Sequence, residues 1–319
     1  MNEKKVFITG VTGFVGRHLA EYFHKQGFTV YGLVRDAGKL QEAEIPFVKA
    51  VQGDLTHIPD EALKDITYFV HVAGVISARH KEKYYEVNAT GTRHLVEQIV
   101  RICPDFKRFL LISSLAAAGP ALERPRSVQD SEEPVSHYGK SKLAGEKEVE
   151  SVIKRFTIIR PPVLFGPYDR GMLMPFQVAA KYGIAPIVGN GRSKMDFLYI
   201  DDFVKACYDA LLSPAAEGKK YFLGENSFNW IDFWKMMNTA SGKKLRVICI
   251  PQVIVKGLGL FNDLTKSSML NSDKAKELIS PNWTSTSTEA QRDFNFRRQA
   301  DTQTALNSTY QWYKSKGWL

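Results

Sequence analysis

The chain has 319 residues, of which 44% are hydrophobic, 12% aromatic and 24% charged, a composition typical of a globular protein with room for one large domain and a smaller lobe. The net charge of +9 comes from basic residues scattered among acidic ones, as in KEKYYE and SKLAGEKEVE, and the lack of a basic stripe argues against nucleic-acid binding. Three cysteines (Cys103, Cys207 and Cys249) lie far apart without metal-ligand spacing, which favours a reduced, cytoplasmic protein without a metal site.

The first half of the sequence alternates strands and helices. Continuous apolar runs predict strands that are buried on both faces: KVFIT, TVYGLV, FVKAVQ, YFVHVA, RFLLIS and FTIIR. Between them, helical patterns cover GRHLAEYFHKQG, which ends at Gly27, a segment from about Tyr85 to Cys103, and a segment that begins near Tyr138. Strands separated by helical crossovers predict an α/β fold, a Rossmann-type doubly wound parallel sheet.

After Arg160 the pattern changes, because proline and glycine cluster in RPPVLFGPYDRG and IAPIVGNGRSK. Helix signals still recur: Asp201 can cap DFVKACYDALL, and Gly242 can end NWIDFWKMMNTAS. We therefore expect a dinucleotide-binding domain over residues 1–165, segments near 192–214 that return to it, and a smaller C-terminal substrate lobe formed mainly by 166–191 and 215–319.

The most apolar later stretch is VICIPQVIVKGLGLF, residues 247–261. It contains a proline and a lysine and is too short to span a bilayer. We interpret it as a buried or lobe-surface helix, with membrane contact as the alternative, and expect no stable membrane insertion. The start of the chain, MNEKKVFITG, enters a strand without the apolar region of a signal peptide.

A glycine-rich turn follows the first strand directly and opens the first helix. In GVTGFVGRHL, Gly10, Gly13 and Gly16 are spaced GxxGxxG. Glycine allows a tight turn and lets the backbone approach a pyrophosphate, which the positive end of the helix dipole attracts. The position of these glycines between a strand and an amphipathic helix predicts a dinucleotide site.

The ends of the next strands add candidate cofactor contacts. Arg35 stands where an acidic residue would bind the ribose of NAD or an arginine the 2′-phosphate of NADP, and Lys39 is close enough to help. We favour NADP over NAD, because a guanidinium suits phosphate geometry; Asp36 could instead serve the ribose, and Arg35 could be a solvated strand-end charge. Four further residues follow the third and fourth strands, at the edge where such sheets bind ligands: Asp54, Leu55, Ala73 and Gly74.

Tyr138 and Lys142, in SHYGKSKLAGE, stand one helical turn apart. Hydride transfer at a carbinol carbon requires that a proton move on its oxygen. A tyrosine ordinarily ionises near pH ~10, so a cation at position i+4 would help it act as a base. The serines of LLISSLAAAG, Ser113 and Ser114, end the fifth strand and could orient the substrate oxygen.

These motifs occur in one register: GVTGFVG, HVAG, VNATGT, ISSLAAAG, YGKSK and RPPVLFGP. With them the chain resembles the extended short-chain dehydrogenase/reductase family, and within it the NAD(P)-dependent epimerase/dehydratase group. The resemblance implies that Tyr138 is the acid/base, that Lys142 lowers its pKa and contacts the ribose, and that the catalytic serine is Ser114, five residues before Gly119, rather than Ser113. It implies a structural role for Asn88 and a possible homodimer through the helices near 85–103 and 138–154. It also implies cofactor contacts at Gly10, Thr12, Gly13, Phe14, Val15, Gly16, Asp54, Leu55, Ala73, Pro161 and Val163.

Three departures from the family pattern narrow the chemistry. Leu115-Ala116 stands where 4,6-dehydratases carry an Asp-Glu pair, so dehydration is not expected. Val163 and Met195 replace an asparagine and an arginine that contact the nucleotide of sugar-nucleotide substrates. Arg192 or Lys194 could compensate for them, so epimerisation stays open.

We therefore expect an NAD(P)-dependent oxidoreductase that transfers hydride between nicotinamide and a carbonyl or secondary alcohol of a fairly apolar small molecule. The alternative is a UDP-sugar 4-epimerase that recycles bound NAD. A regulatory NADP sensor is disfavoured, because Ser114, Tyr138 and Lys142 are all present. His71, His80 and His137 are interpreted as structural or rim residues. Met172, Met174, Phe176 and Tyr182 are interpreted as lobe core or as walls of an apolar pocket.

Overall fold

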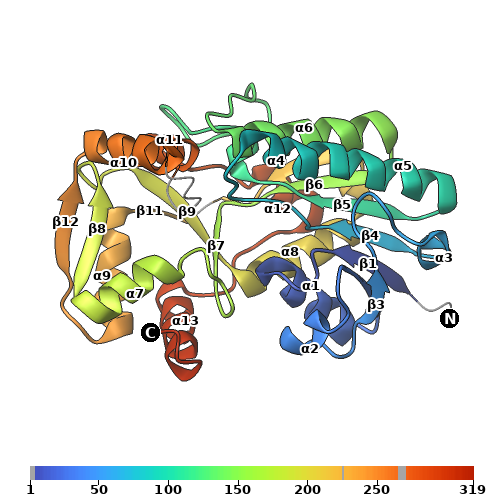
Figure 1. Ribbon diagram of the computed structural model, residues 1–319, viewed down its shortest axis with the longest axis horizontal. Helices are drawn as coiled ribbons and strands as arrows, with labels where there is room; N and C mark the ends of the chain where they lie inside the picture. The colour runs from blue at the N-terminus through green and yellow to red at the C-terminus, as the bar shows by residue number, and fades with distance from the viewer. Residues whose placement is uncertain (1–3, 225, 265–270) are drawn as a thin grey trace.

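The computed structural model describes residues 4–224, 226–264 and 271–319. Its centre is a sheet of seven parallel strands in the order β10-β6-β5-β4-β1-β2-β3 (Figure 1). This is the Rossmann-type doubly wound sheet expected from the alternating pattern. The strands are β1 (Lys5–Thr9), β2 (Thr29–Val34), β3 (Lys49–Gln52), β4 (Tyr68–His71), β5 (Arg108–Ile112), β6 (Phe156–Arg160) and β10 (Lys219–Phe222).

Strand β10 lies beyond the segment near 192–214 that we expected to return to the sheet. Lys219–Phe222 pairs in parallel with β6 and forms the sheet edge. The return therefore continues to Phe222, although residues 215–319 were expected mainly in the lobe. Helix α8 (Ile200–Leu212) begins one residue before Asp201, and its N-cap is Tyr199. Asp201 lies in the first turn, so its predicted capping role is wrong.

Helices cover both faces of the sheet, as two separate hydrophobic clusters show. On one face, α1 (Phe14–Lys25), α8 and α12 (Thr288–Phe294) pack on the strands. On the other face lie α3 (Asp60–Leu63), α5 (Thr92–Ile102) and α6 (His137–Val152). The short helix α2 (Lys39–Glu42) follows β2. Gly27, the residue after the C-cap of α1, has a φ of 80°, as its predicted role at the helix end requires.

The expected helix from Tyr85 to Cys103 is divided into three pieces. Helix α4 (Lys81–Tyr85) runs into a π-helical turn, Glu86–Gly91, and then into α5. The Asn88 side chain bonds to the backbone of Val75, accepting at 2.8 Å and donating at 3.0 Å. We attribute the widened turn to this anchoring, which agrees with the structural role that the family resemblance implies for Asn88.

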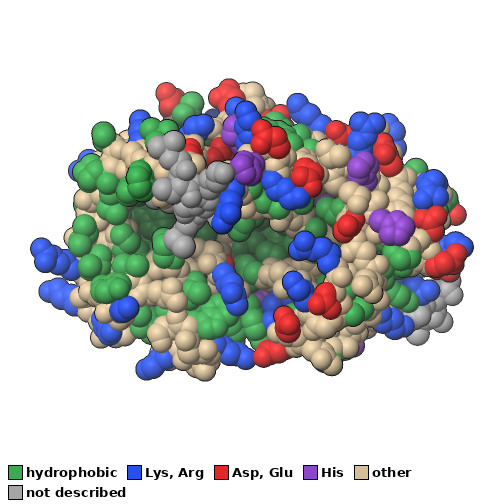
Figure 2. All heavy atoms as spheres, in the orientation of Figure 1, with side chains coloured by type: hydrophobic (Ala, Val, Ile, Leu, Met, Phe, Trp, Pro, Cys, Tyr) green, Lys and Arg blue, Asp and Glu red, His purple; other side chains and the backbone are tan. Residues whose placement is uncertain are grey.

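A smaller lobe stands beside the sheet (Figure 1). The face of the molecule drawn in Figure 2 is hollowed near its middle, and hydrophobic side chains line the hollow. The strands of the lobe form a three-stranded sheet, β11-β9-β7, and a two-stranded sheet, β12-β8. They are β7 (Val163–Phe165), β8 (Ile184–Val188), β9 (Lys194–Tyr199), β11 (Ser227–Asn229) and β12 (Arg246–Ile250). Its helices are α7 (Leu173–Tyr182), α9 (Trp230–Ser241), α10 (Gln252–Leu264), α11 (Ser272–Ile279) and α13 (Thr302–Ser315).

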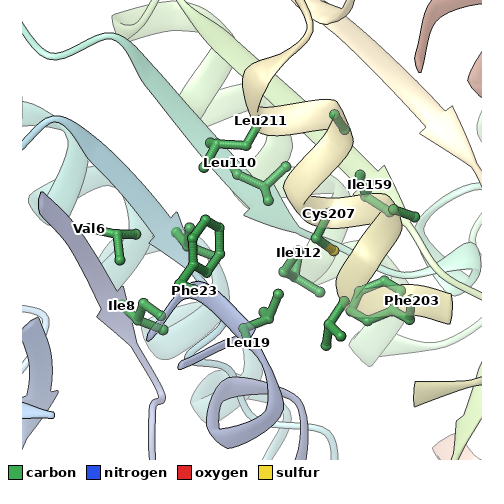
Figure 3. Packing of buried hydrophobic residues seen from close by; sticks show 14 of the residues in the cluster. Val6, Ile8, Leu19, Phe23, Leu110, Ile112, Ile159, Phe203, Cys207 and Leu211 are labelled. Carbon is green, nitrogen blue, oxygen red and sulfur yellow. The ribbon is translucent and has the colours of Figure 1, made fainter. Parts of the chain in front are cut away.

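The two parts have separate cores. Figure 3 shows the main one, where Leu19 and Phe23 of α1 and Phe203, Cys207 and Leu211 of α8 meet the strand residues. The lobe has its own cluster, which includes Phe176, Trp234 and Tyr313. Gly242 ends α9 in the left-handed conformation, as predicted. None of the helices in the described part of the chain is both long and apolar enough to cross a membrane.

Candidate active site

The glycine turn brings three backbone segments into close contact at the carboxyl edge of the sheet. Gly10 has a φ of +69°, and a Cβ there would lie 2.7 Å from the backbone nitrogen of Ala73. A Cβ at Gly16 would overlap the carbonyl oxygen of Gly10 and lie 2.9 Å from the Cα of Val11. Only glycine fits this arrangement, which leaves room for a phosphate against the backbone.

The start of α1 has the properties of an anion site. Gly13 is its N-cap, no side chain accepts a hydrogen bond from the first turn, and that turn contains no acidic residue. The first amide groups of the helix therefore keep their hydrogen-bonding capacity and their positive dipole end. Residues Thr12 to Gly16 thus fit the pyrophosphate of a dinucleotide, which when bound supplies the hydride chemistry of its nicotinamide.

Some of the residues after β2 and β3 are exposed, whereas others already form hydrogen bonds within the protein. Arg35 and Lys39 are exposed, whereas the Asp36 carboxylate accepts the backbone N–H of Gly38 at 2.9 Å. Asp54 accepts hydrogen bonds from the side chain and backbone of Thr56 at 2.6 and 2.8 Å, which lower its pKa. Leu55 is half-buried beside Gly91.

The segment after β4 lies next to Lys142, and the end of β6 lies beside the segment that follows β5. The backbone N–H of Ala73 donates to the hydroxyl of Thr9 at 3.1 Å. A Cβ at Gly74 would lie 3.0 Å from Asn88 Oδ1 and 3.8 Å from Lys142 Nζ. Pro161, directly after β6, accepts the backbone N–H of Leu115 at 2.9 Å, and Val163 begins β7. The structure thus brings the ends of β4 and β6 to the sheet edge where α6 begins.

Helix α6 presents Tyr138 from its first turn. Ser136 caps the helix by accepting the backbone N–H of Gly139 at 2.9 Å. The Tyr138 ring is half-buried, and its hydroxyl shares a hydrogen bond with Ser114. Ser114 also accepts the backbone N–H of Ala116 at 3.1 Å. The hydroxyls of Ser114 and Tyr138 therefore converge on one point at the carboxyl end of β5.

The electrostatics of the pair differ from the expectation that Lys142 lowers the pKa of Tyr138. Burial raises the pKa of Tyr138 to about 12, and the hydrogen bond with Ser114 opposes this shift. Burial lowers the pKa of Lys142 to about 8, while the Glu146 carboxylate opposes the change. The Lys142 ammonium donates to the carbonyl of Ile112 at 2.8 Å. In this geometry burial is the largest influence on the pKa of Tyr138, and the phenol therefore carries its proton at neutral pH.

Ser113 faces away from this point. Its hydroxyl donates to the Glu146 carboxylate, which also pairs with Arg160 at 2.6 Å. Glu132 accepts from the same guanidinium at 2.8 Å, and Lys220 reaches both carboxylates. Ser113 thus belongs to a buried ionic network behind the strand, whereas its neighbour Ser114 contacts Tyr138.

Asn88 joins three elements around Lys142. Besides Val75, its amide donates to the Ser141 hydroxyl at 2.9 Å. A Cβ at Gly145 would overlap the carbonyl oxygen of Asn88, so α6 packs directly on the π-helical turn. These contacts fix the rotation of α6 and hence the direction of Tyr138 and Lys142.

The lobe supplies site residues that the sequence did not point to. Asp273 of α11, which is 7% exposed, accepts the backbone N–H groups of His137 and Tyr138 at 2.6 and 3.1 Å. Glu277 accepts the Ser136 hydroxyl at 2.7 Å. Tyr84 packs on Tyr138 with ring centroids 6.4 Å apart. Capping patterns can place Asp273 on a helix, but no local signal relates it to residues more than 130 positions earlier.

The three histidines near strand ends have different environments. His71 is buried between Thr9 Oγ1, 2.6 Å from its Nδ1, and Thr92 Oγ1, 2.9 Å from its Nε2. Because Thr92 donates to the Asn88 carbonyl, it accepts from Nε2–H, which leaves Nδ1 to accept from Thr9. His71 is therefore neutral and structural. His80 is exposed, and His137 shares a 3.2 Å hydrogen bond with Tyr85.

Of the four lobe residues that we interpreted as core or as pocket walls, two are buried and two are exposed. Met172 and Phe176 belong to the buried lobe cluster, whereas Met174 and Tyr182 are exposed. Val163 and Met195 are half-buried at the edge of the same cluster, and Met195 bridges to Trp283. Within the described ranges, no group of three or more histidine, cysteine, aspartate or glutamate side chains could hold a metal ion.

Comparison with known proteins identifies the family. The model of the NAD dependent epimerase/dehydratase family matches residues 6–224. The chain is 30% identical to a ceramide reductase of Caulobacter vibrioides over 98% of this chain and 96% of that protein. It is 26% identical to the human sterol-4-alpha-carboxylate 3-dehydrogenase, decarboxylating, over 74% of this chain and 65% of the relative.

A solved structure shares the fold over the whole chain. The UDP-glucuronic acid 4-epimerase of Bacillus cereus, in complex with UDP-glucuronic acid and NAD, superposes with a TM-score of 0.80. The match covers 98% of this chain and 99% of that one at 20% identity. The chain therefore belongs to the NAD-dependent epimerase/dehydratase family of extended short-chain dehydrogenases/reductases, and it is an NAD(P)-dependent dehydrogenase, reductase or epimerase.

Proposed function

We propose that this enzyme reduces a ketone, or oxidises the matching secondary alcohol, on an apolar, lipid-like substrate. The observation that carries the proposal is the convergence of the Ser114 and Tyr138 hydroxyls at the carboxyl end of β5, beside buried Lys142. Ser114 holds the substrate oxygen, and Tyr138 exchanges a proton with it. Lys142 binds the nicotinamide ribose.

The protonation state of Tyr138 suits the proton-donating step of a reduction. Because burial raises its pKa to about 12, the phenol carries its proton at neutral pH. It can donate that proton to the oxygen of a ketone on which negative charge develops. In the oxidative direction the phenolate is needed, and its formation demands stabilisation by Lys142 once the site is occupied.

An apolar substrate is supported by the lobe side of the site. Val163 and Met195 stand where family members that bind sugar nucleotides carry polar groups, and both contact the hydrophobic lobe cluster. Such side chains cannot neutralise a diphosphate. The names of two relatives, a ceramide reductase and a sterol dehydrogenase, also refer to lipids. The UDP-sugar 4-epimerase with recycled NAD is the alternative.

NADP is the proposed cofactor. Arg35 directly follows β2 and Lys39 begins α2. Both are exposed, and no described residue forms an ion pair with either. The Asp36 carboxylate, which could have served a ribose, is already bonded to Gly38. Two available cations suit a 2′-phosphate.

Location, domain division and assembly are further proposals. Three free cysteines, two of them buried, suit the reducing cytoplasm. The proposed dinucleotide-binding domain comprises 1–165 with later segments that return to its sheet. A homodimer through α5 and α6 is proposed from the family resemblance, and light scattering of the purified protein tests it.

The test of function uses purified protein with NADPH and a panel of long-chain ketones. We expect substrate-dependent NADPH oxidation that Tyr138→Phe reduces at least about 1000-fold, because the proton donor is lost, while NADPH affinity changes little. Tyr85→Phe removes a hydroxyl bonded to His137 beside the same helix and should retain activity. Wild-type turnover by Tyr138→Phe would refute the mechanism. Tightly bound NAD, near one per chain after denaturation, with turnover of UDP-sugars, would establish the epimerase instead.

A further inference from the structure

Helix α10 exposes an apolar surface. Five of its large hydrophobic side chains are between 46% and 78% exposed. We name them the α10 apolar patch: Val253, Ile254, Leu258, Leu260 and Phe261. Ile254, Leu258 and Phe261 follow the i, i+4, i+7 spacing of one helix face.

The core-facing side of α10 is a different one. Val255 is 3% exposed, and a Cβ at Gly259 would lie 3.0 Å from the Cβ of Ala275 in α11. Through this close approach, the buried side of α10 already packs on α11 with apolar contacts. The patch lies on another side of α10. It is exposed apolar surface that does not contribute to the packing of the lobe core.

Positive charge predominates in the chain segment that carries the patch. Residues 233–262 contain five lysines and arginines and no aspartate or glutamate. Of these cations, Lys244, Arg246 and Lys256 are exposed, and no ion pair joins them to any residue that the structure describes. Lys243 donates to the carbonyl of Ala180. Lys235 pairs with Asp232 at 2.9 Å. The segment thus keeps three exposed cations without an ion-pair partner among the described residues, and one of them, Lys256, lies in α10 itself.

We infer that the α10 apolar patch binds the surface of a membrane that contains anionic lipids. The apolar side chains would enter the boundary of the acyl chains, and the flanking cations would meet the headgroups. The 13-residue helix α10 is too short to span a bilayer, so it lies in the interface plane. A second copy fits less well, because symmetric pairing would bring Lys244, Arg246 and Lys256 of both chains together without counter-charges.

The patch is joined to the active site through α11. Asn271 at the start of α11 donates to the carbonyl of Ala78 at 3.2 Å, and Asp273 accepts from the backbone of Tyr138. Figure 1 shows α10 and α11 side by side at the top of the lobe, with α11 on the side toward α6. A membrane bound at the patch would adjoin the substrate side of the site. Membrane binding itself is independent of the proposed function, but its purpose, access to an apolar substrate, rests on that function.

The experiment is co-sedimentation of the full chain with vesicles, without cofactor or substrate. We expect strong binding to vesicles of phosphatidylcholine and phosphatidylglycerol, weaker binding to phosphatidylcholine alone, and loss of binding in high salt. Val253→Ser/Leu260→Ser/Phe261→Ser should lower the partition coefficient at least about 30-fold. Lys244→Gln/Lys256→Gln should lower it about 20-fold on anionic vesicles only.

Matched controls separate this result from general effects. Val100→Ser removes an exposed apolar side chain from α5, and Lys107→Gln/Lys154→Gln removes two exposed charges from the sheet domain. Both should bind vesicles like the wild type. Unchanged binding by the serine triple variant overturns the inference, as does a wild-type dimer in solution that the same variant converts to monomer. Thermal melting and NADPH binding verify that each variant is folded.

Two variants distinguish a failure of the proposed reductase function from a failure of the membrane-binding inference. Tyr138→Phe should lose turnover and still bind vesicles. The serine triple variant should reduce a short, water-soluble ketone at the wild-type rate and lose activity only on vesicle-borne ketone. Activity without vesicle binding by the wild type would overturn the membrane inference alone.

Discussion

The nucleotide-binding part and the lobe hold distant backbone segments together in different ways. In the first part, glycines allow direct contact: Gly10 and Gly16 close the turn, and Gly145 lies against Asn88. In the second, buried carboxylates accept backbone N–H groups from segments far along the chain. Asp196 accepts from Ser285 at 2.7 Å, and Asp273 from His137 and Tyr138 at 2.6 and 3.1 Å.

The difference has a physical reason. A glycine contact depends on the absence of a side chain, so any substitution is a steric conflict. A carboxylate contact depends on charge and two acceptor oxygens, so it can be weakened without a clash. The carboxylate contacts should therefore respond to loss of charge, whereas the glycine contacts should respond to any added side-chain volume.

The largest effect is expected for Gly16→Ala. Its Cβ would overlap the Gly10 carbonyl and push the start of α1 from the turn. We expect NADPH affinity, measured by fluorescence titration, to fall at least about 100-fold, with a loss of about 3 kcal/mol in the free energy of unfolding.

The matched control for Gly16→Ala is Gly257→Ala in α10. A Cβ there meets nothing within 4 Å, so the replacement should leave NADPH affinity unchanged and stabilise the helix by about 0.5–1 kcal/mol. If both alanine variants bind NADPH like the wild type, the steric account of the turn is wrong.

This contrast also explains what the sequence could predict. The glycine spacing, the six strands of the first half and the Tyr138–Lys142 pair are local patterns, and local patterns determine turns, strands and helix faces. The choice of Ser114 over Ser113 came from the resemblance, and the site geometry agrees, because only Ser114 bonds with Tyr138.

Other features depend on distances in space that a local pattern does not encode. The Asp273 contact crosses 135 residues, and β10 returns to the sheet after the lobe has begun. The pKa of Tyr138 depends on how completely its hydroxyl is buried, which no local pattern shows. The stretch 247–261 divides at Pro251 into a strand and an exposed helix, because proline cannot continue the ladder of β12.

The stability of the nucleotide-binding part should depend on pH through its buried histidine, His71. Burial, with a smaller contribution from Lys142, lowers the pKa of His71 from 6.5 to about 3. Between these values the unfolded chain binds a proton that the native state does not, so stability falls as the pH drops below 6.5. At pH 5 the His71 contribution should cost about 2 kcal/mol.

Urea unfolding at pH 7 and pH 5 measures this difference. His71→Gln, which can still reach the threonines, should lose about 2 kcal/mol less than the wild type between the two pH values. His94→Gln alters an exposed histidine and should follow the wild type. Equal acid sensitivity of all three proteins would exclude His71 as the cause.

The smallest effect is expected at the carboxylate contact between the lobe and the catalytic helix. Asp273→Asn has one acceptor oxygen for two backbone N–H groups, and its amide would face one of them. The charge that favours the positive end of α6 is also lost. We expect kcat to fall about 10-fold through misorientation of Tyr138, stability to fall about 1 kcal/mol, and NADPH affinity to stay the same, because the glycine turn is untouched. Asp263→Asn is the control: Asp263 also accepts a backbone N–H, that of Ser272 at 3.1 Å, but within the lobe. If Asp273→Asn lowers stability while kcat stays at the wild-type value, α6 is held by its contacts with Asn88 alone, and the lobe does not position the tyrosine.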